Sequence, residues 1–321
     1  MRAVVQHDKS RARGRASARV RIGLAVLVLA AIASGCAQDG GGDQVTPAAG
    51  GDQVTPAGGR QPLDAPPARA LDSYAGKLRA AHAARVAAAH RWDLRRTPLA
   101  APPPPAKKPR IRTREGFEVK GHRSSNLPPV FTTVPTRDKV VFLTIDDGAE
   151  KDRAFLRMMR DLDVPYTAFL SGYLVKDDTR YFRKMQSGGV VLNNHTLHHP
   201  NLRGLSYRAQ KREICGMQRY LEKRFGARPD LFRPPFGSYD RATLRAAKAC
   251  GIAYVPLWNQ EVFADHWEYR EGDRKLRPGD IVLTHFRGPE QWKGTMTDMI
   301  RRFLNKVTGQ GFAVGRLEDY L

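Results

Sequence analysis

Residues 139–148 read Lys-Val-Val-Phe-Leu-Thr-Ile-Asp-Asp-Gly, and this stretch decides the fold. The β-branched and aromatic residues over 139–145 predict a buried strand, because such side chains fit a pleated sheet. The strand runs into two adjacent carboxylates, Asp146 and Asp147. Ionising both side chains is costly unless a cation or a hydrogen-bond donor lies nearby. This condition is met if one aspartate binds a metal ion and the other acts as a base. The alternative is that Asp-Asp-Gly simply forms a turn.

Around this strand, short β-branched or aromatic runs alternate with longer amphipathic ones from about residue 129 onward. That order predicts repeated β-α units around a parallel sheet. The expected strands are 139–145, 166–170, 190–194, 231–233, 252–258, 281–285 and 312–314, and the expected helices are 150–163, 179–187, 206–225, 240–250 and 296–309. We therefore expect an α/β fold, a small (β/α)7-type barrel, and leave open whether the barrel closes fully. In such barrels the chemistry gathers at the C-terminal ends of the strands.

The expected third strand is followed by a histidine cluster, Asn194-His195-Thr196-Leu197-His198-His199. His195 and His199 are four residues apart, so one helical turn would present both imidazoles on the same face. Two imidazoles, one carboxylate and an open position for water make a familiar catalytic zinc shell. His198 would then point elsewhere, and we interpret it as a structural residue.

Two more polar residues end expected strands. Arg233 follows a short apolar run and precedes Pro234-Pro235-Phe236-Gly237. A buried arginine needs a carboxylate partner, for which Asp146 is the obvious candidate, and a purely structural salt bridge is the alternative. His285 ends the apolar run 281–285. A lone histidine there is usually a core group, but beside three other polar clusters it becomes a catalytic candidate.

Together the four clusters resemble carbohydrate esterase family 4, the NodB-homology polysaccharide deacetylases. Thr144–Gly148 resembles the family's Thr-Phe-Asp-Asp-Gly motif, His195–His199 its His-Ser/Thr-x-x-His motif, Arg233–Gly237 its Arg-Pro-Pro-Tyr-Gly motif and Leu283–His285 its Leu-x-His motif. The motifs follow the family's order and spacing, and the likeness covers roughly 137–321.

The resemblance implies a metal-dependent hydrolase that removes acetyl groups from N-acetylated sugars of a polysaccharide. A divalent cation, with Zn²⁺ as the expected ion, would be bound by Asp147, His195 and His199. The resemblance makes Asp146 the base that takes a proton from water.

The remaining roles implied by the resemblance concern the groups around that metal. Arg233 would hold Asp146 ionised, and His285 would protonate the departing amine. Phe236 would lie at the substrate with a backbone N–H near the oxyanion, and Leu283 and Trp267 would form a small apolar pocket for the acetyl methyl.

One motif departs from the family, which usually has Asp-x-x-Asp-Trp before the last histidine. Residues 258–267 read Trp-Asn-Gln-Glu-Val-Phe-Ala-Asp-His-Trp. The carboxylate that supports His285 is therefore either Asp265, which we favour, or Glu261. The altered motif leaves two alternative functions open: a catalytically impaired glycan-binding module, and an O-acetyl esterase acting on a wall polymer or xylan.

The N-terminus predicts export. A basic segment leads into the apolar run 22–33, which fits a signal peptide and is too short for a comfortable membrane span. Ala33-Ser34-Gly35-Cys36 resembles a bacterial lipobox, in which Cys36 is lipidated after cleavage. We expect a signal over 1–36 and a protein anchored by lipid to the outer face of the cell membrane. A secreted protein and an uncleaved anchor are the alternatives.

Three segments separate the signal from the expected catalytic domain, 129–321. Residues 37–68 form a Gly/Pro-rich linker in which Gly-Asp-Gln-Val-Thr-Pro-Ala occurs twice. Residues 69–97 predict a basic, Ala-rich helix, either a solvated spacer or a segment that docks on lipid or wall polymer. Residues 98–128 predict a second, Pro-rich basic linker.

The formal net charge of +22 suits an anionic partner or surface. Export argues against nucleic acid, and the sequence shows no nucleic-acid-binding module. We expect a monomer whose partner is an N-acetylated glycan, peptidoglycan or another envelope polysaccharide. Cys215 and Cys250 lie on successive expected helices, so they either form a disulfide or remain two buried thiols.

Overall fold

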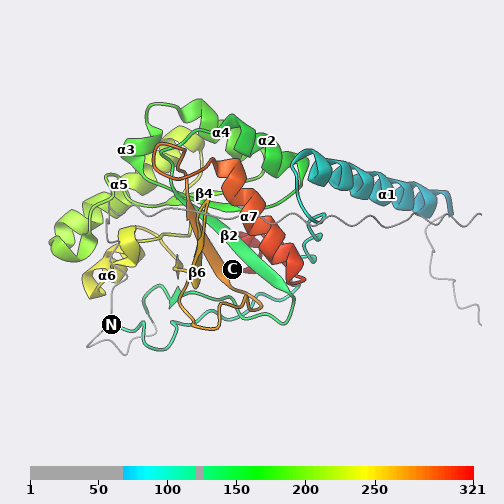
Figure 1. Ribbon diagram of the computed structural model, residues 1–321. Coiled ribbons are helices and arrows are strands. Elements are labelled where there is room, and N and C mark those ends of the chain that lie inside the picture. Colours follow the sequence, from blue (N-terminus) through cyan, green and yellow to red (C-terminus); the bar gives the residue numbers. More distant parts are fainter. Residues whose placement is uncertain (1–67, 120–125) are drawn as a thin grey trace, which may run out of the picture. The chain divides into compact units, whose positions relative to one another are not determined.

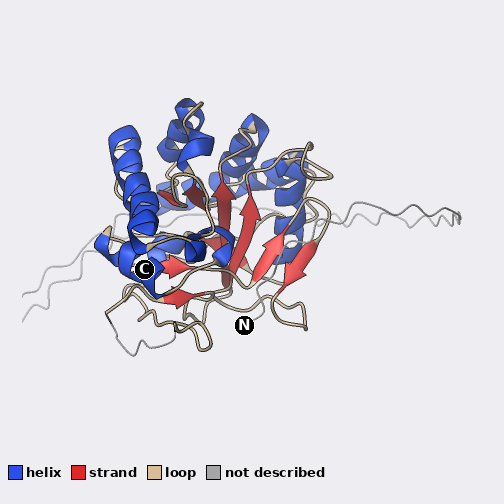
Figure 2. Ribbon diagram, turned by 90° about the vertical axis from the view of Figure 1, so that its left-hand side faces the viewer, coloured by secondary structure: helices blue, strands red, loops and turns tan. Residues whose placement is uncertain are grey.

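Strand β2 (Val140–Asp147) is buried along its whole length and lies at the centre of the sheet. Its parallel neighbours are β3 (Thr167–Leu170), β8 (Ile281–His285) and β9 (Ala313–Gly315). The sheet continues from β3 to β4 (Leu192–Asn194) and from β8 to β6 (Gln260–Val262). Figures 1 and 2 show these strands grouped together, with helices packed along their outer side.

The computed structural model describes residues 68–119 and 126–321. The expected signal, lipobox Cys36 and most of the first linker lie outside these residues. No helix among the described residues is both long enough and apolar enough to cross a membrane.

The sheet curls into an incomplete (β/α)7-type barrel, so the predicted α/β fold is confirmed. The sheet continues through two isolated β-bridges, which pair Asn194 with Phe232 and Leu231 with Tyr254. There it meets a small parallel pair, β1 (Val130–Phe131) and β5 (Val255–Pro256). The expected strand 231–233 is therefore reduced to bridges.

The segment after β5 also differs from expectation. The strand predicted over 252–258 is only the two residues of β5, and the chain then forms an antiparallel hairpin of β6 with β7 (Trp267–Tyr269). The hairpin was not predicted, because Gln260-Glu261 interrupts the apolar run that would mark a strand.

The helices follow the expected order along the chain. They are α2 (Arg153–Asp161), α3 (Gly172–Val175), α4 (Thr179–Ser187), α5 (Tyr207–Phe225), α6 (Arg241–Ala249) and α7 (Met296–Gly309). Side chains cap five of them at the N-terminus, namely Asp152, Asp178, Ser206, Asp240 and Thr295. Only α3 was not expected, since four residues are too few to show a helical period.

Side chains of β2 alternate between two cores, as a strand buried on both faces requires. Val141, Leu143 and Ile145 pack under the helices, in the larger core. Val140 and Phe142 face the barrel interior and its own apolar cluster. Asp146 follows Val140 and Phe142 at even spacing, so the alternation places its carboxylate inside the barrel at the C-terminal end.

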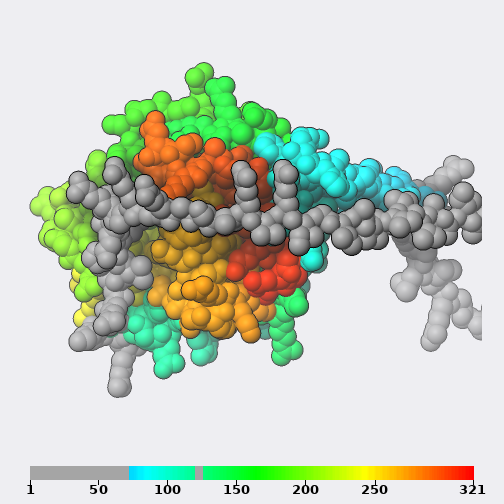
Figure 3. Space-filling view, in the orientation of Figure 1, coloured from blue at the N-terminus to red at the C-terminus, as the bar shows by residue number. Residues whose placement is uncertain are grey.

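The basic, Ala-rich helix is present as α1 (Ala68–Arg91). Its inner end docks on the barrel: Ala88 and Ala89 are buried, and Arg91 and Trp92 both donate hydrogen bonds to Asp161 of α2. Figure 3 shows this helix, in blue and cyan, extending from the rest of the folded chain.

Residues 98–119, the first of two described parts of the expected second linker, lie against the barrel. Leu99 forms a bridge with Ala313 of β9. Arg114 donates hydrogen bonds to Thr132 and Asn259 and forms a 2.9 Å ion pair with Glu271. The folded unit therefore begins well before residue 129, because basic residues that we predicted to lie in a linker form contacts with the barrel.

Cys215 of α5 and Cys250, which ends α6, form a disulfide across 35 residues. This resolves the open choice between a disulfide and two thiols. Cross-linking a loop of this length restricts the unfolded chain and stabilises the fold by about 3–4 kcal/mol.

We predict that the double variant Cys215→Ala/Cys250→Ala has a free energy of unfolding about 3–4 kcal/mol below that of the wild type. The measurement is urea denaturation followed by circular dichroism. Wild-type protein held reduced is the control and should lose a similar amount. A variant as stable as the oxidised wild type would contradict the prediction.

Candidate active site and metal centre

Neighbouring strands bring the candidate residues to one end of the barrel. In the parallel register, Asp146 of β2 is paired with His285 of β8, and Asp147 with Leu170 of β3. His195 directly follows β4 and donates its backbone N–H to Leu170. Arg233 in turn donates its backbone N–H to Asn194 at the end of β4. All four sequence clusters therefore meet at the C-terminal ends of adjacent strands.

Asp147, His195 and His199 form a compact group of metal-ligand type, with their ligand atoms all within 4.8 Å of one another. The Asp147 Oδ1 atom lies 3.6 Å from His195 Nε2 and 3.3 Å from His199 Nε2. This oxygen is buried and has no hydrogen-bond partner among the described residues. A buried carboxylate oxygen without a partner is costly, and a cation between it and the two imidazoles would remove that cost.

The protonation of the two histidines also fits a cation. His195 Nδ1 lies 2.7 Å from the carbonyl oxygen of Arg233, which can only accept, so Nδ1 carries the proton. Nε2 is then left as an acceptor facing Asp147. Burial lowers the pKa of both His195 and His199 to about 4, so both rings are neutral near pH 7.

The histidines meet through a loop, not through the helical turn that we expected. Residues 195–200 have no helical structure, and Thr196 and His199 have φ of 73° and 56°. Asp147 and Phe236 are also left-handed, with φ of 80° and 61°. Non-glycine residues seldom adopt this conformation, and such strain concentrates at functional sites.

Arg233 is fully buried, and its guanidinium donates to Asp146 Oδ1 at 2.8 Å. It also donates to Thr144 and to the carbonyl of Pro256, and it lies 4.4 Å over the ring of Phe169. Burial raises the pKa of Asp146 to about 6, and the Arg233 charge limits the rise. Because Arg233 holds Oδ1, the other carboxylate oxygen of Asp146 is left to face His195, 3.7 Å from Nε2.

The partner of His285 is Glu261, and the expectation of Asp265 is corrected. Glu261 Oε1 lies 3.1 Å from His285 Nδ1. The cause is strand register: Glu261 is in β6 beside Leu283 of β8, two residues before His285. Asp265 lies in the β6–β7 turn, where it is exposed and contacts His266 at 2.6 Å. Burial lowers the pKa of His285, but the Glu261 carboxylate and the two aspartates outweigh burial, and the net pKa is raised.

Of the two residues expected to form an apolar pocket, Leu283 lies on the strand that carries His285 and Trp267 lies elsewhere. Leu283 is buried and faces the barrel interior, on the same side of β8 as His285. Trp267 is not at the site: it lies in β7, stacks on Phe303 of α7 and packs against the outer core. Its position in an antiparallel hairpin outside the barrel is the physical reason for this correction.

Phe236 contacts the histidine cluster, whereas His198 points away from it. Phe236 is exposed, and its ring stands edge-on to that of His199, with the centroids 4.7 Å apart. His198 is exposed and turned away, with Nδ1 2.9 Å from Glu213 of α5. It anchors the histidine loop to the next helix.

Arg287 is a site residue that the sequence did not suggest. It lies 3.4 Å from Asp147 Oδ2, the oxygen that faces away from the histidines. Burial raises the pKa of Asp147, yet the fields of His285, His195, His199 and Arg287 bring the net pKa below its usual value. The only sequence signal was a basic residue two positions after His285.

Comparisons with known proteins agree with this site. The polysaccharide deacetylase family model matches residues 133–255. This range includes Asp146, Asp147, His195, His199 and Arg233. An uncharacterised protein of Streptomyces coelicolor is 44% identical over 200 residues, covering 62% of this chain and 80% of that protein. The peptidoglycan-N-acetylmuramic acid deacetylase PdaA of Bacillus subtilis is 26% identical over 160 residues, covering 47% of this chain and 61% of PdaA.

Among solved structures, the Bc1960 peptidoglycan N-acetylglucosamine deacetylase aligns with a TM-score of 0.52 and 23% identity, covering 60% of this chain and 92% of that chain. A family 4 pseudoenzyme of Bacillus anthracis, BA3943, also aligns with a TM-score of 0.52, at 24% identity, covering 60% of this chain and 69% of that chain. These likenesses establish the fold.

We predict that Arg233→Met lowers the free energy of unfolding by about 3–5 kcal/mol, because it leaves the Asp146 carboxylate buried without its partner. Urea denaturation measures the loss. The double variant Arg233→Met/Asp146→Asn is the control and should lose clearly less than the sum of the two single changes. Additive losses would mean that the two side chains are not coupled.

We predict that Glu261→Gln lowers the pKa of His285, because the imidazolium loses its negative neighbour. The measurement is an NMR titration of the histidine ring in metal-free protein. Asp265→Asn removes a nearby carboxylate of the same kind and should leave the His285 pKa unchanged. Equal shifts in both variants would contradict the assignment of Glu261.

Proposed function

This chain belongs to the polysaccharide deacetylase family, and from that premise we propose that it hydrolyses acetyl groups from N-acetylated sugars of an envelope polysaccharide, with peptidoglycan as the first candidate. The observation that carries the proposal is the unpartnered Asp147 Oδ1 between two neutral imidazoles, beside a separately held Asp146. Relatives named as peptidoglycan deacetylases support the choice of polymer.

Asp147, His195 and His199 would hold a divalent cation, for which Zn²⁺ fits best because one carboxylate and two imidazoles are typical zinc ligands. When bound, such an ion polarises a carbonyl and makes water a stronger nucleophile near neutral pH. The chain's part is to fix the ligands: the Arg233 carbonyl orients His195, and Arg287 holds the far oxygen of Asp147.

Asp146 is the proposed general base. Arg233 occupies one of its oxygens and leaves the other free on the side of the metal ligands. With a pKa of about 6, Asp146 is ionised above that pH and can accept a proton from the attacking water. Its buried position excludes bulk solvent, so the proton has few competing acceptors.

His285 is the proposed general acid. Glu261 favours its protonated form, and the β2–β8 register places it directly beside Asp146. Base and acid therefore sit on neighbouring strands, where one takes the proton of water and the other gives a proton to the leaving amine. Phe236 lies at the rim, and its backbone N–H in the left-handed turn is the proposed donor to the developing oxyanion.

A glycan-binding module without catalysis is less well supported than it was from sequence. Its main support was the altered motif before His285, and Glu261 supplies a carboxylate to His285 despite that alteration. An O-acetyl esterase would use the same site with a different leaving group, so only a comparison of substrates separates it.

The proposed location is outside the cell membrane, held there by a lipid on Cys36. A lipid anchor would keep the catalytic domain near the membrane, so polymer close to the membrane is the first candidate substrate.

We predict that the full chain releases acetate from peptidoglycan or N-acetylglucosamine oligomers in the presence of Zn²⁺, and that Asp146→Asn lowers the rate by at least about 100-fold. Acetate is measured by a coupled enzymatic assay, and zinc binding by calorimetry should persist in the variant. Asp265→Asn is the matched control and should keep its activity. Near wild-type release by Asp146→Asn would remove Asp146 from the role of base, and release from O-acetylated substrates alone would favour the esterase.

A further inference from the structure

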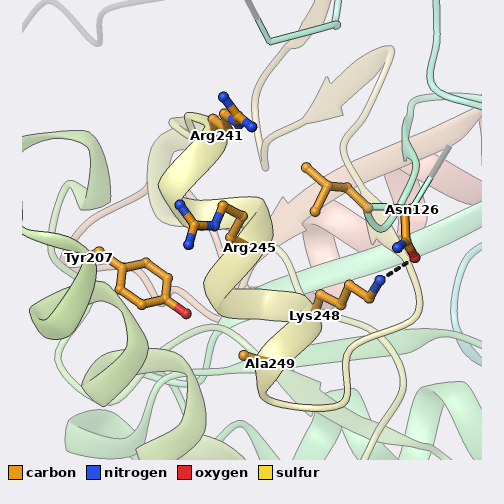
Figure 4. Close-up of a pocket in the computed structure, with 7 residues that line it drawn as sticks. Asn126, Tyr207, Arg241, Arg245, Lys248 and Ala249 are labelled. Carbon is orange, nitrogen blue, oxygen red and sulfur yellow. Dashed lines mark hydrogen bonds between the residues drawn. The ribbon is translucent and has the colours of Figure 1, made fainter. Parts of the chain in front are cut away.

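A hollow of about 570 Å³ lies on the surface beside α6, apart from the metal ligands. Figure 4 shows its walls: α6 supplies a row of side chains, Tyr207 stands at the start of α5, and residues 126–127 close the other side. The lining residues are Asn126, Leu127, Tyr207, Arg241, Arg245, Lys248 and Ala249. None of the residues of the site described above contributes to it.

The hollow is strongly basic. Arg241, Arg245 and Lys248 are spaced four and three residues apart, so they lie along one face of α6, over about 10 Å of helix. All three are exposed, and none forms an ion pair with any residue that the structure describes. None of the described residues that line the hollow is acidic, and the nearest acid along the chain, Asp240, caps α6.

Two of these cations are held in place rather than left free to move. The Arg245 guanidinium lies over the ring of Tyr207, 5.1 Å from its centroid. Lys248 donates a hydrogen bond to Asn126. The Cys215–Cys250 disulfide ties α5 to the end of α6, so the two helices that carry these groups cannot separate. A fixed row of charges loses less conformational entropy on binding than a mobile one.

The row begins close to the candidate active site. Phe236, whose ring contacts His199, is five residues before Arg241, so the two Cα atoms are at most about 18 Å apart. A polymer strand that crosses Phe236 can therefore reach the first cation of α6 and continue along the row. Three charges in line match a strand that carries negative groups at intervals.

We propose that this hollow binds an anionic stretch of the substrate polysaccharide, with Arg241, Arg245 and Lys248 pairing with carboxylates along the strand. The inference rests on the proposed function, since it takes the occupant to be the polymer that is deacetylated. It adds a recognition surface to that function: the metal site takes the acetyl group, and the row on α6 selects a charged polymer and holds it in register.

The test compares the triple variant Arg241→Gln/Arg245→Gln/Lys248→Gln with a control of equal charge change, Arg157→Gln/Arg219→Gln/Lys223→Gln. The control residues are exposed, lie on α2 and α5, and form no ion pair with the described residues. Both are made in the full chain carrying Asp146→Asn, so that binding is measured without turnover. The probes are soluble peptidoglycan strands that keep their carboxylate-bearing peptides, and neutral N-acetylglucosamine oligomers.

We predict that the α6 triple variant binds the carboxylate-bearing strands about tenfold more weakly, since each surface pair contributes little and three act together. Its binding should also lose most of its dependence on NaCl concentration. Binding of the neutral oligomers should not change, and the control triple should bind both probes as the parent does. Thermal unfolding verifies that both variants fold.

The inference is overturned if the α6 triple variant binds the carboxylate-bearing strands like the parent, or if the control triple loses as much. It is also overturned if, with a phosphate-rich wall polymer as a third probe, the α6 change weakens binding of that polymer only. The proposed function is judged separately, by acetate release from the protein with Asp146 restored. A chain that releases no acetate yet needs the α6 row for binding would refute the activity and leave the recognition surface standing.

Discussion

The buried ion pair between Arg233 and Asp146 is the interaction on which the rest of the site depends. Arg233 is inaccessible to solvent, and its guanidinium joins the end of β2 to the carbonyl of Pro256 in β5. Its backbone carbonyl at the same time fixes the tautomer of His195. One residue therefore positions both the proposed base and a proposed metal ligand. It also links the strands in the part of the barrel where isolated bridges stand in place of a strand.

This pair also explains how two adjacent aspartates have different properties. Asp146 lies inside the barrel, where burial raises its pKa to about 6 despite Arg233. Asp147 has a left-handed backbone; burial raises its pKa, but the histidines and Arg287 beside it outweigh burial and the net pKa is lowered. Environments that push the pKa values of neighbouring carboxyls apart separate a proton acceptor from a permanent anion. The strain at Asp147 is the structural cost of that separation.

Sequence reasoning located most of the fold and of the candidate site, because strand ends and polar clusters are local signals. Asp146, Asp147, His195, Arg233 and His285 all lie at the strand ends where the pattern placed them. It failed where the answer depends on register between distant strands: Glu261 reaches His285 only through the β6–β8 pairing. Trp267 was misplaced for the same reason, since an antiparallel hairpin turns it outward. Arg287 was missed because it belongs to none of the sequence motifs.

The segments that carry the site lead directly into the two helices that the disulfide joins. The histidine loop is tied to α5 by the contact between His198 and Glu213, and the turn at Phe236 runs along the chain into α6. Fixing α5 to α6 through Cys215 and Cys250 therefore limits how far His199 and Phe236 can move apart. The same bond fixes the basic row on α6 relative to Tyr207. A single covalent constraint thus acts on both the candidate active site and the basic hollow, so a polymer strand bound in the hollow would reach the candidate active site in a defined register.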